Sequence, residues 1–321
     1  MIVCSPSCGV APQSNSGGEV YEVNLLPALA GLGIKSHVLI ARGKTVALPV
    51  YRSSIIERVV LPGRLARGFR WWVMPLVMPK AIVRCWEAHR FDVLRVHSPK
   101  FLGPAAVIAQ SRIRRRHGVR VPIVMHQHHI DTGRNWIERW SFLRADRIVT
   151  DSTFAADQIS ELAWMPSGFV EVAYCGTTIA YDRQPGWVLA RRGNEYRVLA
   201  MGPLIHRKDP GWVIRAVAVA NQNGVKARLV WIGDGPLRAK AQRLAESLKV
   251  PADFLGRVTE DRKRREMLSA HAFIHGATVE GFPLSVLEAM ASWRPVVARR
   301  AASLPEMLPS KATLFDTPTE A

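Results

Sequence analysis

Cysteine is scarce in this sequence: Cys4, Cys8, Cys85 and Cys175 are the only thiols in 321 residues. Four scattered thiols are too few for the disulfide framework that small secreted domains need. Cys4 and Cys8 are close together, but nothing elsewhere in the sequence supports a metal site built on them. The sequence therefore predicts reduced thiols.

Long apolar runs are missing as well. No run approaches the roughly eighteen residues that a membrane-spanning helix needs. Residues 1–5 are typical of a strand, and they are not followed by the apolar region and cleavage site of a leader peptide. Hydrophobic residues still make up 48% of the chain, which is enough to form buried cores. We expect a globular cytoplasmic protein whose membrane contact, where it has one, is peripheral and on the inner face.

Acidic residues are few, with 26 Asp and Glu against 44 Lys and Arg, and the net charge is +18. Over half of this excess lies between residues 61 and 116, where twelve basic residues accompany only two acidic ones. Such a concentration indicates an anionic partner, such as lipid headgroups, nucleic acid or a phosphorylated substrate. No nucleic-acid-binding motif accompanies the charge, so we do not expect nucleic acid as a partner.

The segment 62–90 combines basic and aromatic residues. Arg64, Arg67 and Arg70 lead into aromatic side chains at positions 69, 71, 72 and 86. Arginine beside tryptophan suits a membrane interface, where each basic residue contributes about 1 kcal/mol near an anionic surface. A buried helix with solvated flanks explains the pattern equally well. We expect an anionic membrane surface as a partner of this segment.

The chain is longer than one core usually supports, which predicts two domains. Short apolar runs alternate with helical patterns, as in parallel sheets covered on both faces, and turn-forming residues at 182–194 mark a boundary. The predicted class is α/β, with doubly wound domains at 1–185 and 195–321. Predicted strands are 2–5, 37–41, 58–61, 92–96, 122–125, 147–150, 170–174, 197–201, 228–232, 253–255, 272–274, 295–298 and one near 314. Predicted helices are 19–30, 70–89 (kinked or split by its prolines), 104–116, 154–162, 210–221, 236–248, 262–270 and one from Pro283.

Glu280 and Glu288 are eight positions apart across a predicted loop-to-helix junction. Pro283 suits the first helical position, so Glu280 would precede the helix and Glu288 lie about two turns inside it. Free backbone N–H groups in the segment 281–284, with the positive end of the helix dipole, would form an anion site. A glutamate beside such a site suits a substrate with phosphate and hydroxyl groups. On these residues alone, an amphipathic core helix with a capping glutamate is an equally good interpretation.

Other motifs follow predicted strands, where doubly wound folds bind their ligands. Gly17-Gly18 could approach a phosphate closely, although such glycines more often only form a turn. Gly233-Asp234-Gly235 lacks the rest of a dinucleotide fingerprint and predicts a structural turn. The run His126-Gln127-His128-His129 could coordinate a metal, but nothing else supplies converging ligands, so we expect no metal site. A histidine that faces a ligand cleft is the better interpretation.

These features together resemble glycosyltransferase family 4, the glycosyl transferases group 1, and the resemblance covers most of the chain. The most specific part is EGFPLSVLEAMA at 280–291, which looks like the family's two glutamates separated by seven residues. The other matching segments are SGG at 16–18, RADRIVTDS at 144–152, VWIGDGP at 230–236, FLGRV at 254–258, PVVA at 295–298 and LPE at 304–306.

The resemblance implies a GT-B fold, in which two Rossmann-like domains face each other across a cleft. The N-terminal domain would take the acceptor and the C-terminal domain the donor. The implied reaction is retaining transfer of a hexose from a nucleoside-diphosphate sugar, which is a co-substrate, without an essential metal or other cofactor. The acceptor would be a lipid-linked glycan, a polysaccharide or a small molecule.

The resemblance also implies roles for single residues. Glu280 would hold the transferred sugar and Glu288 the ribose hydroxyls. Lys208, helped by Arg207 and the helix amides, would meet the charge of the departing diphosphate. His126 would face the sugar, with His128 as the second choice. The other predicted nucleotide contacts are Gly17, Gly18, Arg257, Gly281, Phe282, Pro283 and Leu284.

Several positions depart from the family pattern. Pro203 stands where an arginine usually helps the lysine bind diphosphate, and Arg207 could replace it. Trp293 stands where a glycine commonly follows the Glu288 helix, which would demand a different helix exit. Cys175 and Ala277 also differ. The chain stops at position 321, where the family continues with helices, which we interpret as a truncation or an exposed apolar face.

Two function classes therefore remain open. The first is an active glycosyltransferase, and the second is a non-catalytic relic or a nucleotide-sugar-binding subunit. A transfer assay would separate them. Donor and acceptor identity are set by loop shapes that the sequence does not reveal.

Overall fold

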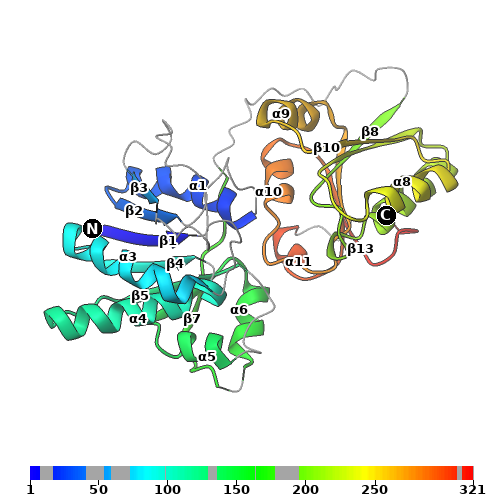
Figure 1. Cartoon of the computed structure of the whole chain (residues 1–321). Helices are drawn as coiled ribbons and strands as arrows, with labels where there is room; N and C mark the ends of the chain where they lie inside the picture. Colours follow the sequence, from blue (N-terminus) through cyan, green and yellow to red (C-terminus); the bar gives the residue numbers. More distant parts are fainter. Residues whose placement is uncertain are drawn as a thin grey trace. The chain divides into compact units, whose positions relative to one another are not determined.

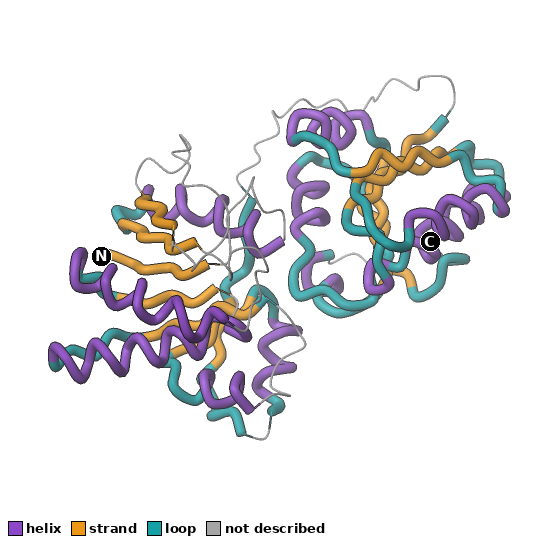
Figure 2. The backbone as a smooth tube through the Cα atoms, in the orientation of Figure 1, coloured by secondary structure: helices purple, strands orange, loops and turns teal. Residues whose placement is uncertain are grey.

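The structure, a computed structural model, describes residues 1–7, 17–40, 54–58, 73–97, 99–128, 136–162, 164–177, 195–308 and 313–320. The chain divides into two compact units, Met1–Gly176 and Thr177–Ala321 (Figure 1). The predicted boundary at 182–194 lies outside the described residues. Both units combine helices with a sheet (Figure 2).

The first unit is a seven-stranded sheet in the order β3-β2-β1-β4-β5-β6-β7, and its pairings are parallel. Parallel neighbours need crossover connections, and helices follow β1, β3, β4, β5 and β6. The strands are β1 (Ile2–Ser7), β2 (Lys35–Ile40), β3 (Ser54–Arg58), β4 (Val93–His97), β5 (Ile123–Gln127), β6 (Arg147–Thr150) and β7 (Val170–Val172). The helices are α1 (Gly17–Gly31), α3 (Met74–His89), α4 (Pro99–His117), α5 (Trp136–Phe142) and α6 (Thr153–Ser160).

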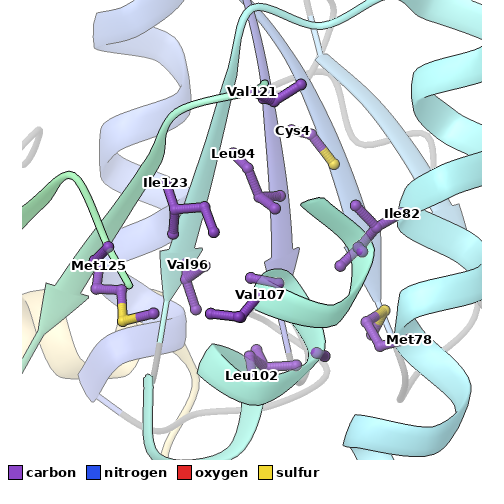
Figure 3. Close-up of a cluster of buried hydrophobic side chains, with 14 of the residues drawn as sticks. Cys4, Met78, Ile82, Leu94, Val96, Leu102, Val107, Val121, Ile123 and Met125 are labelled. Carbon is purple, nitrogen blue, oxygen red and sulfur yellow. The ribbon is translucent and has the colours of Figure 1, made fainter. Parts of the chain in front are cut away.

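The core of the first unit lies between the sheet and helices α3 and α4. Leu94 and Val96 of β4 pack with residues of these helices, such as Ile82 (Figure 3). Burying each such side chain contributes roughly 1.5–3 kcal/mol. Because alternate strand residues point to opposite faces, Arg95 and His97 lie on the other face of β4. The same alternation that builds this core thus places polar side chains on the opposite face of the sheet.

The second unit is a six-stranded parallel sheet in the order β10-β9-β8-β11-β12-β13. Separate apolar clusters cover its two faces, one containing Leu199 and Met201 and the other Ala200. The strands are β8 (Tyr196–Met201), β9 (Ala227–Ile232), β10 (Ala252–Gly256), β11 (Ala272–His275), β12 (Val296–Arg299) and β13 (Leu314–Phe315). The helices are η3 (His206–Lys208), α7 (Pro210–Gln222), α8 (Arg238–Ser247), α9 (Glu260–Ser269), α10 (Leu284–Ala291) and α11 (Leu304–Met307).

The doubly wound architecture predicted from the sequence is confirmed, with differences in detail. The third strand spans Ser54–Arg58, and residues 59–61 of the predicted strand lie outside the described residues. Helix α3 is not split, because Pro75 lies in its first turn and the helix continues through Pro79. The short helices α5, α11 and η3 were not predicted, since each is under eight residues and shows little periodicity.

The interpretation of the segment 62–90 is partly wrong. Residues 62–72 lie outside the described residues, but Trp86 is 4% exposed and belongs to the core. Its ring packs against His117, and the Arg90 guanidinium lies 4.2 Å from its centre. Trp86 therefore has no membrane-facing role. Among the described residues, no helix combines the length and apolar character needed to cross a bilayer.

Candidate functional site

The strand order of each unit reverses at one point, which is where doubly wound folds bind ligands. In the second unit this point lies between β8 and β11. The loop after β8 carries Arg207 and Lys208, and the loop after β11 carries Glu280. Residues far apart in the sequence thus meet at the carboxyl edge of this sheet.

Lys208 and Glu280 form a direct ion pair between the Lys208 Nζ and the Glu280 Oε1 atoms. Arg207 approaches the other carboxylate oxygen, with its NH1 atom 3.7 Å from Oε2. Glu280 is 8% exposed, whereas the Arg207 side chain is about half exposed. Two cations therefore converge on one mostly buried carboxylate, as expected if all three residues serve one site.

The two loops are tied together by their backbones. Thr278 donates its N–H to the Arg207 carbonyl oxygen at 2.9 Å. The Ser303 hydroxyl donates to the Glu280 carbonyl oxygen at 3.2 Å. Gly202, with φ +140°, lets the lysine side chain pass closely, because a Cβ here would lie 3.2 Å from the Lys208 Cε. These contacts hold Lys208 and Glu280 in place.

The glycines after β9 serve this loop packing. Gly233 has φ +127°, and a Cβ on it would lie 2.1 Å from the Gly202 carbonyl oxygen. A Cβ on Gly235 would lie 2.5 Å from the Leu204 carbonyl oxygen. No side chain fits at either distance, so both positions require glycine. This geometry agrees with the predicted structural turn.

Helix α10 places Glu288 inside the unit. The helix begins at Leu284, with Pro283 as its N-cap rather than its first residue as predicted. Pro283 has no N–H, so only the other residues of the 281–284 segment can donate to an anion. Glu288 is 6% exposed, and the Lys263 Nζ lies 3.2 Å from its Oε1. Burial raises the pKa of Glu288, although the Lys263 charge opposes this effect.

Two further basic residues lie at the carboxyl ends of strands of this sheet. Arg257 is exposed directly after Gly256, the last residue of β10. Arg299, the last residue of β12, donates to Asp209 at 3.0 Å, and Asp209 also caps α7. His275 at the end of β11 is fully buried, and burial, followed by the charges of Lys208 and Arg207, holds its pKa well below the ordinary value. His275 is therefore neutral near pH 7.

The first unit carries a separate buried polar network at the carboxyl ends of β4, β5 and β6. Arg95 binds Glu22 of α1 through its NH1 atom, at 2.9 and 2.6 Å from the two carboxylate oxygens. Its NH2 atom lies 3.3 Å from the His126 Nδ1. The His126 Nε2 lies 2.7 Å from Asp151, which also contacts the His128 Nδ1. His97 also belongs to the network, because the His128 Nε2 lies 3.0 Å from the His97 Nδ1.

The chemistry of the partners fixes the hydrogen positions in this network. Arginine only donates, so the His126 Nδ1 accepts, and an ionised Asp151 only accepts, so the His126 Nε2 donates. Burial, followed by the neighbouring His128, lowers the pKa of His126 to about 3, which keeps its ring neutral. Burial alone would raise the pKa of Asp151, but the hydrogen bonds from the two histidines outweigh it and hold the pKa low. The Cys175 thiol is hydrogen-bonded to Asp151. Burial raises the pKa of Cys175, so the thiol stays protonated.

His126, His128 and Asp151 could also hold a metal ion, since each places a ligand atom within 4.8 Å of the others. The expectation that no further ligand converges on the histidine run is therefore wrong. Parallel pairing of β5 with β6 brings Asp151 beside it. A metal on the His126 Nε2 would require hydrogen on its Nδ1, which would then face the donating Arg95. The ion-free hydrogen-bond arrangement consequently fits these side chains better.

The remaining predicted positions are placed as follows. Gly17 and Gly18 form the start of α1, and His129 lies outside the described residues. Trp293 adopts φ +58°, so the chain keeps a left-handed helix exit without a glycine. The expectation of a different exit is wrong. Cys4, Cys85 and Cys175 are buried and belong to no disulfide among the described residues, and Cys8 lies outside them.

Comparisons with protein families match both halves of the chain. A family model described as Glycosyltransferase Family 4 matches residues 15–181, just over half of the chain. A model described as Glycosyl transferases group 1 matches residues 186–320.

Curated relatives share about a quarter to a third of their residues with this chain over the aligned parts. The GDP-mannose-dependent alpha-(1-6)-phosphatidylinositol dimannoside mannosyltransferase of Mycobacterium tuberculosis is 26% identical over 288 residues, covering 84% of this chain and 72% of the relative. The phosphatidylinositol N-acetylglucosaminyltransferase gpi3 subunit of Schizosaccharomyces pombe is 32% identical over 125 residues, covering 38% of this chain and 27% of the relative.

Solved structures share the fold. Anabaena HepE in complex with UDP-glucose superposes with a TM-score of 0.75 at 20% identity, covering 100% of this chain and 87% of HepE. WaaG, a glycosyltransferase involved in lipopolysaccharide biosynthesis, gives a TM-score of 0.66 at 14% identity, covering 96% of this chain and 83% of WaaG. These likenesses show that the chain has the GT-B fold.

Proposed function

The chain belongs to Glycosyltransferase Family 4, and we propose that it moves a hexose from a nucleoside-diphosphate sugar to an acceptor hydroxyl with retention. The observation that carries this proposal is the convergence of Lys208 and Arg207 on Glu280 at the carboxyl edge of the second sheet. Cations suit a diphosphate, and a carboxylate suits sugar hydroxyls. Their proximity supports a ligand that carries both groups.

The proposed chemistry follows from the charges of this site. Transfer breaks the bond between the anomeric carbon and a phosphate oxygen, and the electron pair stays on the diphosphate. Glycosyl transfer develops positive charge on the sugar and negative charge on the leaving group. Lys208 and Arg207 stabilise the departing diphosphate, and fixed charges of this kind supply several kcal/mol in a water-poor site. The acceptor oxygen forms the new bond, and its proton passes to the departing phosphate oxygen or to water.

The transferred sugar and the ribose of the nucleotide are proposed to bind different carboxylates. Glu280, once Lys208 binds the diphosphate, accepts hydrogen bonds from the transferred hexose. Glu288 accepts hydrogen bonds from the ribose hydroxyls. The start of α10 and Arg257 are proposed to complete the nucleotide contacts of the second unit. The contacts proposed for the first unit are Gly17, Gly18 and His126, with His128 as the alternative histidine.

A lipid-linked acceptor is proposed ahead of a polysaccharide or a small molecule. Two of the curated relatives carry phosphatidylinositol in their names. The basic surface of the first unit supports a peripheral position on an anionic membrane. One part of this surface is a groove of about 210 Å³ between α3 and α4. Lys80, Arg84, Arg112 and Arg116 line this groove together with Val83 and Glu87.

The membrane part of the proposal is tested by co-sedimentation with liposomes. Binding to vesicles that contain phosphatidylserine is expected to fall sharply as salt rises, because exposed charges are screened. Arg84→Glu with Arg112→Glu should weaken it further. Equal binding to phosphatidylcholine vesicles would contradict an electrostatic contact.

The enzymatic part is tested by turnover of the full chain with a panel of UDP- and GDP-sugars. Release of nucleoside diphosphate that depends on a lipid extract, and survives a chelator, is the expected result. The alternative is a non-catalytic relic or nucleotide-sugar-binding subunit, which the proline at position 203 favours. Binding of nucleoside diphosphate without turnover of any donor would select that alternative.

A further inference from the structure

Lys263 of α9 lies between two carboxylates. Its Nζ is 3.2 Å from the Glu288 Oε1 and 2.7 Å from the Glu260 Oε2. The Lys263 side chain is 16% exposed and that of Glu288 is 8% exposed, whereas the Glu260 side chain is 79% exposed. Lys263 is thus the buried partner of Glu288, and Glu260, three positions earlier on the same helix, holds the ammonium from the solvent side.

We propose that Lys263 is a positioning residue, which keeps Glu288 ionised and oriented for the ribose hydroxyls of the donor. This inference rests on the proposed function, in which Glu288 binds ribose. Ribose hydroxyls donate to a carboxylate, and a carboxylate has about four acceptor sites. Lys263 contacts one oxygen of Glu288, so acceptor capacity remains for two hydroxyls. A protonated Glu288 would lose part of that capacity.

The charges around Glu288 explain why it needs such a partner. Burial raises the pKa of Glu288, and Lys263 is the neighbouring charge that lowers it, whereas Glu260 raises it. Burial alone would lower the pKa of Lys263, but Glu288 and Glu260 outweigh it and keep the ammonium charged. Removing the ammonium would therefore leave a buried carboxyl beside Glu260, with its pKa raised further.

Among the described residues, Lys263 is the cation whose charge lowers the pKa of Glu288. The strands β11 and β12 contribute Phe273, Val296 and Ala298 to the apolar cluster that contains Val286 of α10. The charged or titratable side chains at the ends of these strands are engaged elsewhere. Arg299 binds Asp209, and His275 is influenced by Lys208 and Arg207.

The experiment is a calorimetric titration of the full chain with UDP and with GDP, between pH 5.5 and 8.5. Terminal phosphates titrate in this range, so the affinity of each variant is divided by that of the wild type at the same pH. Lys263→Met is expected to bind within a few fold of the wild type at pH 8.5. Its relative affinity should fall roughly tenfold for each unit of pH below the raised pKa of Glu288.

Three control variants make the test specific. Lys263→Arg keeps the charge and should restore the wild-type pH profile. Lys240→Met makes the same change at an exposed site on α8 and should give a ratio near one at every pH. In a Glu288→Gln background, Lys263→Met should no longer introduce pH dependence, because the titrating group is absent.

The outcomes separate the two levels of the proposal. If the wild type binds neither nucleotide, the proposed function fails. If the wild type binds but Lys263→Met shows a pH-independent ratio, the positioning role is overturned. Tighter binding by Lys263→Met at every pH also overturns it, since Lys263 would then compete with ribose for Glu288.

Discussion

Lys208 and Glu280 are paired with each other in the second unit, and each side chain is only 10% exposed. Both are proposed to contact the donor, one through its diphosphate and the other through its sugar. A diphosphate that binds Lys208 is therefore expected to compete with Glu280 for the ammonium. The pair also neutralises part of the charge of this cation.

Glu280→Gln should separate binding from catalysis. The neutral amide releases Lys208, so nucleoside diphosphate binding should be unchanged or tighter. Transfer should fall by about 10² or more, because an oriented charge near the reacting sugar is lost. Calorimetry and turnover on one preparation test this, with exposed Glu246→Gln as the control. Weaker nucleotide binding in Glu280→Gln would contradict the competition between Glu280 and the diphosphate.

Arg207 is predicted to replace the arginine missing at position 203. Its guanidinium lies near the same carboxylate as the Lys208 ammonium, which supports a shared role. Arg207→Ala should cut transfer by about 10², the effect of losing one positioned donor, and Pro203→Arg should change little. The converse result, a silent Arg207→Ala and a faster Pro203→Arg, would show that nothing has replaced the lost guanidinium.

Sequence patterns predicted much of this second unit because its signals are local. Apolar runs marked the parallel strands, and Pro283 marked the start of α10 to within one residue. Lys263 was not identified, because its importance depends on α9 packing beside Glu288, which the sequence pattern does not reveal. The same holds for Arg299, which lies ninety positions from its partner Asp209.

The polar network of the first unit shows more clearly what a sequence pattern does not reveal. The histidine run was noticed, but its partners Asp151, Arg95 and Glu22 come from three other elements. Strand order and register bring them together, and neither is visible in a single sequence. For this reason the convergence of Asp151 on the two histidines was missed.

His126 should make stability depend on pH. Its pKa of about 3 in the folded chain lies below the unfolded value of about 6.5, so the unfolded state binds more protons between these values. The buried neutral ring of His126 contributes its full stabilisation above pH 6.5, and this contribution is lost as pH falls. Linkage predicts a loss of about 2 kcal/mol between pH 7 and 5.

Urea unfolding of the wild type and of His126→Gln at these two pH values tests this expectation. The free energy of unfolding of the wild type minus that of His126→Gln should be about 2 kcal/mol smaller at pH 5 than at pH 7. Exposed His206→Gln serves as the control and should leave the pH dependence as it is in the wild type. A difference that stays constant from pH 7 to 5 would contradict a neutral, buried His126.

Trp293 should be a strained position. It is 57% exposed and has φ +58°, a conformation that costs L-residues roughly 1–2 kcal/mol. Glycine removes this strain. Its greater backbone freedom also stabilises the unfolded state by about 0.5–1 kcal/mol. Trp293→Gly should therefore stabilise the chain by roughly 0.5–1 kcal/mol, measured as a rise in Tm. Trp293→Ala, which keeps the strain, should give no rise, and an equal rise in both variants would rule out this cause.

The most direct test of the central claim, that the second unit binds the nucleotide of a sugar donor, is calorimetry of UDP and GDP with the wild type and with Glu288→Ala. Each charge-assisted hydrogen bond from ribose contributes roughly 1.5–3 kcal/mol. One of the two nucleotides is expected to bind the wild type, and Glu288→Ala is expected to bind it about ten- to a hundredfold more weakly. Unchanged affinity in Glu288→Ala would contradict the account.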